Sequence, residues 1–205
     1  MSEQSEARPP RPWLKWALGG AALIGVAAVL YIVAQASFTP SGAGGVKSLA
    51  RGEMAKLVVP AAATPAPATS FYDAAGKPLR VADLKGKVVV LNLWATWCAP
   101  CVAEMPTLAR LSQEYAGQPV EVVAVSLDRA SEVDKARLFI ARHAPLKFYS
   151  DPKSSLPFAF DPPAAGVPTT VIYGKDGIER GRLSGGADWS GQDAKAVIDA
   201  VLAQS

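Results

Sequence analysis

The sequence predicts an α/β domain with a central mixed sheet flanked by helices, preceded by one N-terminal transmembrane helix. Two observations predict this class. From residue 87 onward, apolar runs that suit buried strands alternate with segments that suit helices. Near the N-terminus, residues 16–38 carry no charged side chain, and a helix of this length spans the hydrocarbon core of about 30 Å.

The length and charge of the chain limit the possible functions. Its 205 residues are enough for one domain with a substantial core and some sequence outside it. The formal net charge is only +3, and Arg8, Arg11 and Lys15 precede the apolar segment. This placement indicates membrane orientation rather than nucleic-acid binding, so we expect no nucleic-acid partner.

The basic residues also predict how the anchor is oriented. Residues 1–15 should form a cytoplasmic tail and residues 16–38 a single-pass span of the cell inner membrane, which leaves the C-terminal domain in the periplasm. The alternative is a cleavable signal peptide, because Ala34-Gln35-Ala36 fits a cleavage site. The uncharged stretch exceeds the usual apolar region of roughly 7 to 15 residues, which favours an uncleaved anchor. Both possibilities export the domain.

A linker is expected between the anchor and the domain. Residues 39–69 contain Gly, Ser and Pro and end in an Ala/Pro-rich tether, and a short helix could form at residues 49–59. The folded domain should therefore cover residues 70–205.

Strands and helices then follow in turn. The first clear strand is residues 87–94, an apolar, β-branched run that suits a central strand buried on both faces. A helix over residues 98–115 follows, with a kink expected at Pro106 because proline has no N–H to donate. The remaining elements are a strand at 120–127, a helix at 131–142, an extended piece at 147–149, a helical turn at 154–160, a hairpin of 169–173 and 178–183, and a closing helix at 190–202.

The two cysteines, Cys98 and Cys101, lie directly behind the first strand at the start of the first helix. Only two residues separate them, so a disulfide here would remove little entropy from the unfolded chain and suits redox chemistry better than structural stabilisation. Free backbone N–H groups and the positive end of the helix dipole favour a thiolate at this position. We predict that the pair forms a redox-active disulfide.

The sequence around the cysteines resembles a known family. The string WCAPCVAEMP, which begins at Trp97, and the later GVPT, which begins at Gly166, are similar to the membrane-anchored TlpA/ResA-like thiol-disulfide oxidoreductases of bacteria, members of the thioredoxin-like superfamily. The resemblance extends from about residue 49 to the C-terminus and implies a thioredoxin-like fold. Some TlpA-type proteins carry an additional cysteine pair, which this chain lacks.

This resemblance implies catalytic roles for three residues. Cys98 is expected to attack a substrate disulfide, and Cys101 then resolves the mixed disulfide from one helical turn deeper. Glu104 lies three residues past Cys101, on nearly the same helix face, and is the candidate for proton transfer. Burial would raise its pKa and make it a usable acid or base near neutral pH. The alternative is that Glu104 is a solvated helix residue.

Four further residues are expected to contact substrate. Pro100 should tune the reduction potential, and Trp97 should line the substrate surface. By resemblance Pro168 should be cis, so that the backbone at Val167 pairs with an extended substrate segment; a trans loop proline is the alternative.

The function implied by the resemblance is periplasmic reduction of cysteine pairs in proteins of cytochrome maturation, either in cytochrome oxidase copper-site assembly or in apocytochrome c. Such a protein-disulfide reductase needs electrons from a membrane donor of the thiol-transporting type and no cofactor. Two alternatives stay open. The dithiol could carry Cu(I), as in a copper metallochaperone, since thiolates suit that ion. The protein could also be a net disulfide oxidant or isomerase, which would differ in redox poise.

The sequence predicts no metal site. His143, the only histidine, falls at the predicted end of a helix, and nothing places it near Cys98, which also disfavours a Cys–His protease. Two cysteines and one histidine fall short of a four-ligand zinc centre. The acids Asp128, Glu132 and Asp134 form no recognisable catalytic pair or metal-ligand spacing, and we assign them no role.

Overall fold

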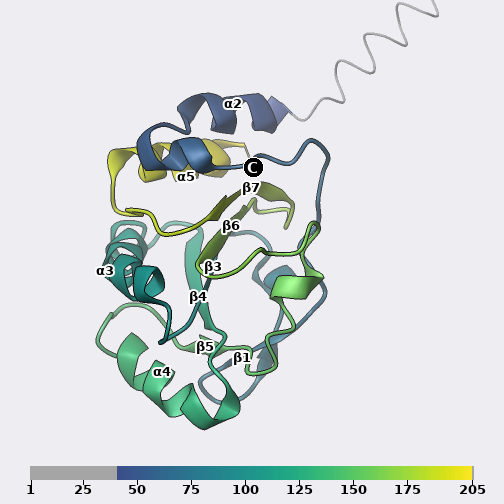
Figure 1. Ribbon diagram of the computed structural model, residues 1–205. Helices are drawn as coiled ribbons and strands as arrows, with labels where there is room; N and C mark the ends of the chain where they lie inside the picture. The colour runs from purple at the N-terminus through teal and green to yellow at the C-terminus, as the bar shows by residue number, and fades with distance from the viewer. Residues whose placement is uncertain (1–40, 205) are drawn as a thin grey trace, which may run out of the picture. The chain divides into compact units, whose positions relative to one another are not determined.

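A mixed sheet runs through the centre of the computed structural model, which describes residues 41–204 (Figure 1). Within this part the sheet has seven strands in the order β2-β1-β5-β4-β3-β6-β7. The central strand β3 pairs parallel with β4 and antiparallel with β6, which confirms the predicted mixed sheet. The strands are β1 (Phe71–Asp73), β2 (Pro78–Leu79), β3 (Val88–Trp94), β4 (Val120–Ser126), β5 (Tyr149–Ser150), β6 (Thr169–Tyr173) and β7 (Glu179–Ser184).

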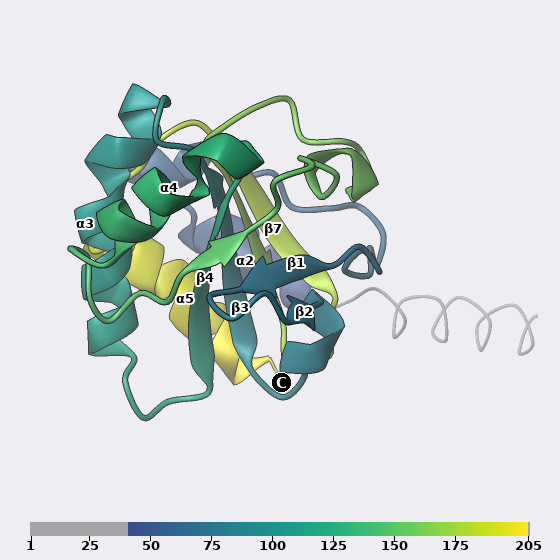
Figure 2. The ribbon, with the colours of Figure 1, turned by 90° about the horizontal axis from the view of Figure 1, so that it is seen from below.

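Three helices lie close to the predicted ranges 98–115, 131–142 and 190–202, whereas the helix Ser41–Leu49 was not predicted, and the short helix expected at 49–59 is only a 3₁₀ turn. They are α2 (Ser41–Leu49), α3 (Ala99–Glu114), α4 (Val133–Ile140) and α5 (Gln192–Ala203), with short 3₁₀ turns η1 (Gly52–Lys56), η2 (Val81–Leu84), η3 (Ala130–Glu132) and η4 (Pro157–Ala159). Helix α3 contacts β4 and α5 contacts β3, and Figure 2 shows both helices on the same side of these strands. Helix α3 continues through Pro106, where the expected kink stays a prediction.

Strand β3 is buried along its whole length, as its sequence predicts. Alternate side chains face two different hydrophobic clusters. Val88, Val90 and Trp94 belong to the larger cluster, to which all four helices contribute. Val89 and Leu91 belong to the second cluster, on the opposite face. The alternation places Asn92, the one polar residue of the strand, on the same face as helix α3.

Two further features of the fold escape the sequence-based prediction. The hairpin of β1 and β2 was not expected, because strands of two or three residues are too short to show a period. The boundary expected at residue 70 also differs from the structure, where the compact unit begins at Ser41. Residues of the expected linker are fully buried, among them Val46, Met54 and Leu57, because the sheet and α5 leave apolar surface that this segment covers.

The segment preceding β1 also covers the edge of the sheet. Val58 exchanges two backbone hydrogen bonds with Arg182 of β7, both of 2.8 Å. Further along, the N–H of Glu179 donates to the carbonyl of Thr64 at 2.8 Å. An edge strand with free backbone groups invites aberrant pairing, and this segment occupies part of that edge.

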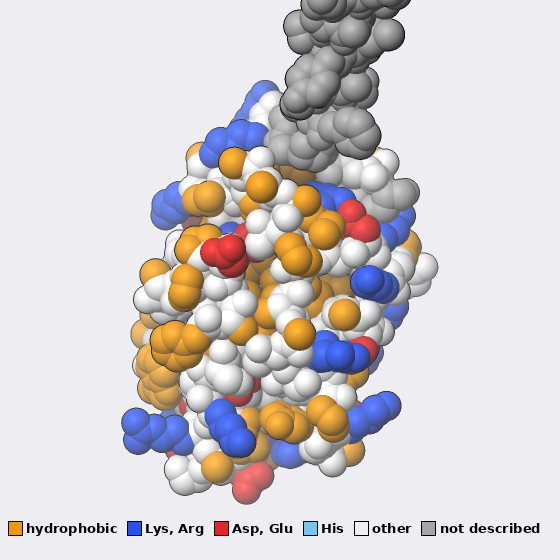
Figure 3. All heavy atoms as spheres, turned by 90° about the vertical axis from the view of Figure 1, so that its right-hand side faces the viewer, with side chains coloured by type: hydrophobic (Ala, Val, Ile, Leu, Met, Phe, Trp, Pro, Cys, Tyr) orange, Lys and Arg blue, Asp and Glu red, His pale blue; other side chains and the backbone are white. Residues whose placement is uncertain are grey.

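The predicted cytoplasmic tail and membrane anchor, residues 1–38, lie outside the described residues. Among residues 41–204, no helix is both long and apolar enough to cross a bilayer. The face of the molecule in Figure 3 carries hydrophobic side chains in scattered groups, with basic and acidic side chains interspersed between them.

Candidate active site

Cys98 and Cys101 form a disulfide at the start of α3, with Cα atoms 5.3 Å apart. Cys98 is the N-cap of the helix, and its sulfur accepts a hydrogen bond of 3.3 Å from the N–H of Cys101. Pro100 lies in the first turn, where N–H groups have no helical acceptor. A residue without an N–H therefore loses no hydrogen bond at this position, and the helix can begin here. Cys98 is 5% exposed and Cys101 is fully buried. Of the two sulfurs, only that of Cys98 is open to an incoming partner.

Glu104 is buried beside the dithiol on the same helix, with only 3% of its surface exposed. Its Oε1 accepts a hydrogen bond of 2.8 Å from Asn92, and its Oε2 accepts bonds from the N–H of Ala187 at 3.1 Å and the indole of Trp189 at 3.2 Å. Burial raises the pKa of Glu104, while these three hydrogen bonds act to lower it. The expected burial of Glu104 is confirmed, and the alternative of a solvated helix residue is wrong.

Asn92 joins Glu104 to the sheet. Its amide nitrogen donates both to Glu104 and, at 2.9 Å, to the hydroxyl of Thr170 on β6. Sequence reasoning did not assign a role to Asn92. The available signal was a lone amide in a wholly apolar strand, because a buried polar group requires hydrogen-bond partners.

A pocket of about 290 Å³ opens beside the dithiol and gives access to Glu104. It is lined by Glu53, Pro100, Ala103, Glu104, Thr107, Gly186, Ala187 and Asp188. Glu53 comes from the segment that was expected to be a linker, and its carboxylate accepts a hydrogen bond of 2.5 Å from the N–H of Asp188. A nearly buried acid that lines an open pocket can exchange protons with solvent.

The loop before β6 lies next to the dithiol helix. The Val167–Pro168 peptide bond is cis, as expected. The carbonyl of Pro168 accepts a hydrogen bond of 2.8 Å from Gly185. At the neighbouring Gly186, a Cβ atom would lie 3.5 Å from Cβ of Pro100. The chain after β7 therefore contacts both the proline loop and the dithiol helix.

The expected substrate-binding residues differ in exposure. Trp97 is 63% exposed and Pro100 is also exposed, so both can touch a partner. Val167 is half-buried and packs against both hydrophobic clusters, whereas Pro168 is buried. The structure thus assembles an exposed rim of apolar residues around a barely exposed sulfur.

Asp128 fixes the loop that leads into the dithiol, a role that sequence reasoning did not assign. It follows β4, is fully buried, and accepts hydrogen bonds from the N–H of Thr96 at 3.0 Å and from its hydroxyl at 2.7 Å. The hydroxyl of Ser126 donates to it at 2.8 Å. Glu132 and Asp134 lie in η3 and at the start of α4, and no hydrogen bond of their side chains links them to the dithiol in the described part of the chain.

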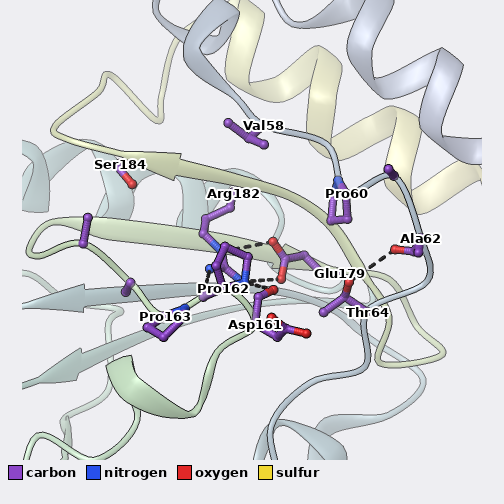
Figure 4. A pocket seen from close by; sticks show the side chains of 13 residues that line it. Val58, Pro60, Ala62, Thr64, Asp161, Pro162, Pro163, Glu179, Arg182 and Ser184 are labelled. Carbon is purple, nitrogen blue, oxygen red and sulfur yellow. Dashed lines mark hydrogen bonds and ion pairs between the residues drawn. The ribbon is translucent and has the colours of Figure 1, made fainter.

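A second pocket, of about 470 Å³, lies between the segment before β1, the loop of residues 161–165 and β7 (Figure 4). At its base the guanidinium of Arg182 forms an ion pair of 2.7 Å with Glu179 and donates to the backbone carbonyls of Asp161 and Pro162. It also lies 5.0 Å from the ring centre of Phe160. Arg182 thus holds in place the loop that leads to Pro168.

His143 follows α4, where its Nδ1 lies 2.9 Å from the carbonyl oxygen of Phe139 and its ring stacks on that residue. Among residues 41–204, no three His, Cys, Asp or Glu side chains lie close enough together to hold a metal ion.

Comparison with known proteins identifies the family. The Redoxin family matches residues 61–198. A stretch of 50 residues is 58% identical to the thiol-disulfide oxidoreductase ResA of Oceanobacillus iheyensis, which covers 24% of this chain and 26% of that protein. Over 119 residues the chain is 34% identical to ResA of Bacillus subtilis, which covers 55% of this chain and 61% of that protein. The matches therefore span less than two thirds of either relative.

A solved structure shares the fold. The crystal structure of a protein from Chlorobium tepidum, described as a thiol:disulfide interchange protein DsbE, matches with a TM-score of 0.60 and 27% identity, over 68% of this chain and 96% of that one. This match and the relatives agree with the thioredoxin-like layout of sheet, dithiol helix and cis-proline loop. The chain belongs to the Redoxin family and is a ResA-like protein of the thioredoxin superfamily.

Proposed function

We propose that this protein is a thiol-disulfide oxidoreductase, and that its reaction is carried by the Cys98–Cys101 pair with Glu104 as proton partner. One observation carries the proposal: a disulfide at a helix N-terminus, with one sulfur slightly exposed, adjoins a buried carboxyl that lines an open pocket. The names of the ResA relatives support the same chemistry.

The exchange proceeds in two steps. The thiolate of Cys98 attacks a disulfide of the partner protein, forms a mixed disulfide, and releases one partner sulfur as a thiolate. Cys101 gives its proton to Glu104, and its thiolate attacks the sulfur of Cys98. The second partner sulfur then leaves as a thiolate, and the protein keeps the disulfide. Two electrons have passed to the partner, and the proton on Glu104 can move to a departing thiolate.

We further propose that residues 16–38 anchor the chain in the cell inner membrane and that its domain works in the periplasm. The uncharged stretch and the basic residues before it support this topology. In that compartment a reductant needs a membrane electron donor of the thiol-transporting type. By the family resemblance, its substrates are cysteine pairs of proteins in cytochrome maturation.

The experiment that tests the activity uses the full-length chain with Cys101→Ser. Without a resolving thiol, Cys98 should remain joined to its substrate as a stable mixed disulfide. The probes are two oxidised peptides: one carries a Cys-x-x-Cys-His haem-attachment sequence, and the other carries the cysteine pair of a copper site. The double variant Cys98→Ser/Cys101→Ser is the control. If neither peptide is trapped while Cys98 still reacts with an alkylating reagent, the activity proposal is wrong.

The topology has its own test, which the cysteine content makes clean. The chain contains only two cysteines, so a membrane-impermeant thiol reagent reports on them alone. After mild reduction, Cys98 should be labelled in intact cells whose outer membrane has been made permeable. Labelling that requires lysis of the inner membrane would contradict the periplasmic location. The mass of the mature chain would show whether the span is cleaved.

A further inference from the structure

Trp189 is tied to the dithiol helix at two points. It is fully buried, its indole N–H donates to Oε2 of Glu104 at 3.2 Å, and its backbone N–H donates to the hydroxyl of Thr107 at 3.1 Å. That hydroxyl in turn donates to the backbone carbonyl of Glu104 at 2.7 Å. These three bonds form a closed ring between one tryptophan and one turn of α3, so the indole cannot turn away without breaking one of them.

The two hydrogen bonds to Oε2 of Glu104 favour one protonation state of this carboxyl group. A backbone N–H and an indole N–H can only donate, so the contacts from Ala187 and Trp189 both favour the ionised carboxylate. The amide of Asn92 differs, because it can present either an N–H or an oxygen to its neighbour. The segment of residues 185–189 therefore supplies two of the three hydrogen bonds that favour the charged acid, and neither of these two donors can become an acceptor.

A second buried tryptophan shows that this contact is not a consequence of burial alone. Trp94 is as fully buried as Trp189, yet its indole N–H has no hydrogen-bond partner within the described part of the chain. Buried indoles usually find an acceptor, so the two residues offer a natural contrast. The indole N–H of Trp189 donates to Glu104, whereas that of Trp94 has no acceptor among residues 41–204.

We propose that Trp189 is a positioning residue for proton transfer: its indole N–H holds the Glu104 carboxylate as a fixed acceptor beside the dithiol. This inference rests on the proposed thiol-disulfide exchange. Trp189 acts through Glu104 and not directly on the reacting sulfurs. The loop that carries it adjoins both Pro168 and Pro100, so the same segment links proton transfer to the substrate surface.

Other groups also face Glu104 and enter the design of the test. Cys98 and Cys101 lie on its own helix, and Glu53 from η1 and Asp188 from the loop line the same pocket. A hydrogen bond from Ser190 holds the pKa of Asp188 below its usual value, so this residue stays ionised. Strands β3 and β6 contribute Asn92 and Thr170, which do not titrate.

The first measurement needs no variant. In the oxidised full-length protein, the indole N–H resonance of Trp189 should titrate with the same midpoint as the side-chain carboxyl carbon of Glu104, both followed by NMR. The indole resonance of Trp94 should not follow this titration. In Glu104→Gln the dependence at Trp189 should vanish. A Trp189 indole that ignores the titration of Glu104 would overturn the inference.

The second measurement compares Trp189→Phe with Trp94→Phe. Both variants remove an indole from the core, but only the first removes a donor to Glu104. A hydrogen bond to a charged group is strong enough that its loss should raise the Glu104 midpoint by about one to two pH units. Trp94→Phe should leave the midpoint near that of the wild type. Equal shifts in the two variants would overturn the proposal, and Thr107→Val provides a milder change if Trp189→Phe does not fold.

The oxidised protein separates this inference from the proposed activity. No thiol takes part in the NMR titration, so a shift in Trp189→Phe supports the positioning role even if the reduced chain exchanges with no disulfide. In the reduced chain, the titration midpoint of Glu104 should also be higher in Trp189→Phe. The pH dependence of disulfide exchange should then shift to higher pH by the same amount. A displaced midpoint with an unchanged exchange profile would overturn the link to proton transfer.

Discussion

Two buried carboxylates flank the entry to the dithiol helix, and they differ in what surrounds them. Asp128 accepts hydrogen bonds from a backbone N–H and two hydroxyls and holds the loop before Cys98. Glu104 follows Cys101 on the helix and accepts hydrogen bonds from three N–H groups. It also lines an open pocket. Burial alone therefore does not mark a proton-transfer group. Its place on the dithiol helix and at an open pocket distinguishes Glu104, whereas Asp128 supports the backbone.

The largest expected effect separates the two residues by rate. Glu104→Gln keeps the shape and removes the exchangeable proton, so disulfide exchange at pH 7 should slow by about 100-fold, the usual contribution of a positioned acid or base. Folding should change little. Stopped-flow measurement of the reduced chain with an oxidised peptide checks this. A variant as fast as the wild type would remove Glu104 from the mechanism.

The opposite pattern is expected at Asp128. Asp128→Ala leaves the N–H of Thr96 and two hydroxyls without their acceptor, so the free energy of unfolding should fall by about 2 to 3 kcal/mol. The pH at which exchange is half-maximal should not move. Urea denaturation of the oxidised chain gives the stability, with the exposed Asp134→Ala as the control, for which a change within about 0.5 kcal/mol is expected.

The buried carboxyl of Glu104 should also make the stability of the protein depend on pH. The folded chain raises the pKa of Glu104 above its ordinary value of 4.5 because of burial. An acid with a raised pKa contributes stability that is fully present below the unfolded value and is lost as pH rises through the folded value. The stability of wild type relative to Glu104→Gln should therefore fall as pH rises above about 4.5, by about 1.4 kcal/mol for each unit of raised pKa. Denaturation curves of both proteins across this range test the sign, and a constant difference would contradict it.

The smallest expected effect lies at Glu53, on the segment before the matched family region. Glu53→Ala removes the acceptor for the N–H of Asp188 and should reduce stability by about 0.5 to 1.5 kcal/mol. Glu53→Gln keeps an acceptor and should behave like the wild type. Thermal denaturation distinguishes the two variants. Equal losses in both would indicate that charge, rather than the hydrogen bond, matters there.

The local features of the site could be predicted from the sequence. The apolar run of β3, the short Cys98–Cys101 spacing and the i, i+3 position of Glu104 are properties of neighbouring residues, and the structure places each of them as expected. The cis bond before Pro168 followed from the family resemblance.

Contacts between distant segments could not be predicted in the same way. Trp189 is 85 residues from Glu104, and Asp128 is 32 residues from Thr96, so no periodicity connects them. The burial of Val46, Met54 and Leu57 was missed for a related reason, since the Gly and Ala content of the segment around them suggests a linker until the apolar surface of α5 is known. Asn92 was also missed, although a lone amide in an apolar strand is visible in the sequence alone.

We propose that the Cys98–Cys101 pair exchanges disulfides and favours reduction of its partners. Equilibration of the full-length protein with glutathione buffers of known potential tests it most directly. We expect one two-electron transition near that of thioredoxin, about −270 mV. A transition near −120 mV would identify an oxidant, and a disulfide that no buffer reduces or re-forms would contradict the claim itself.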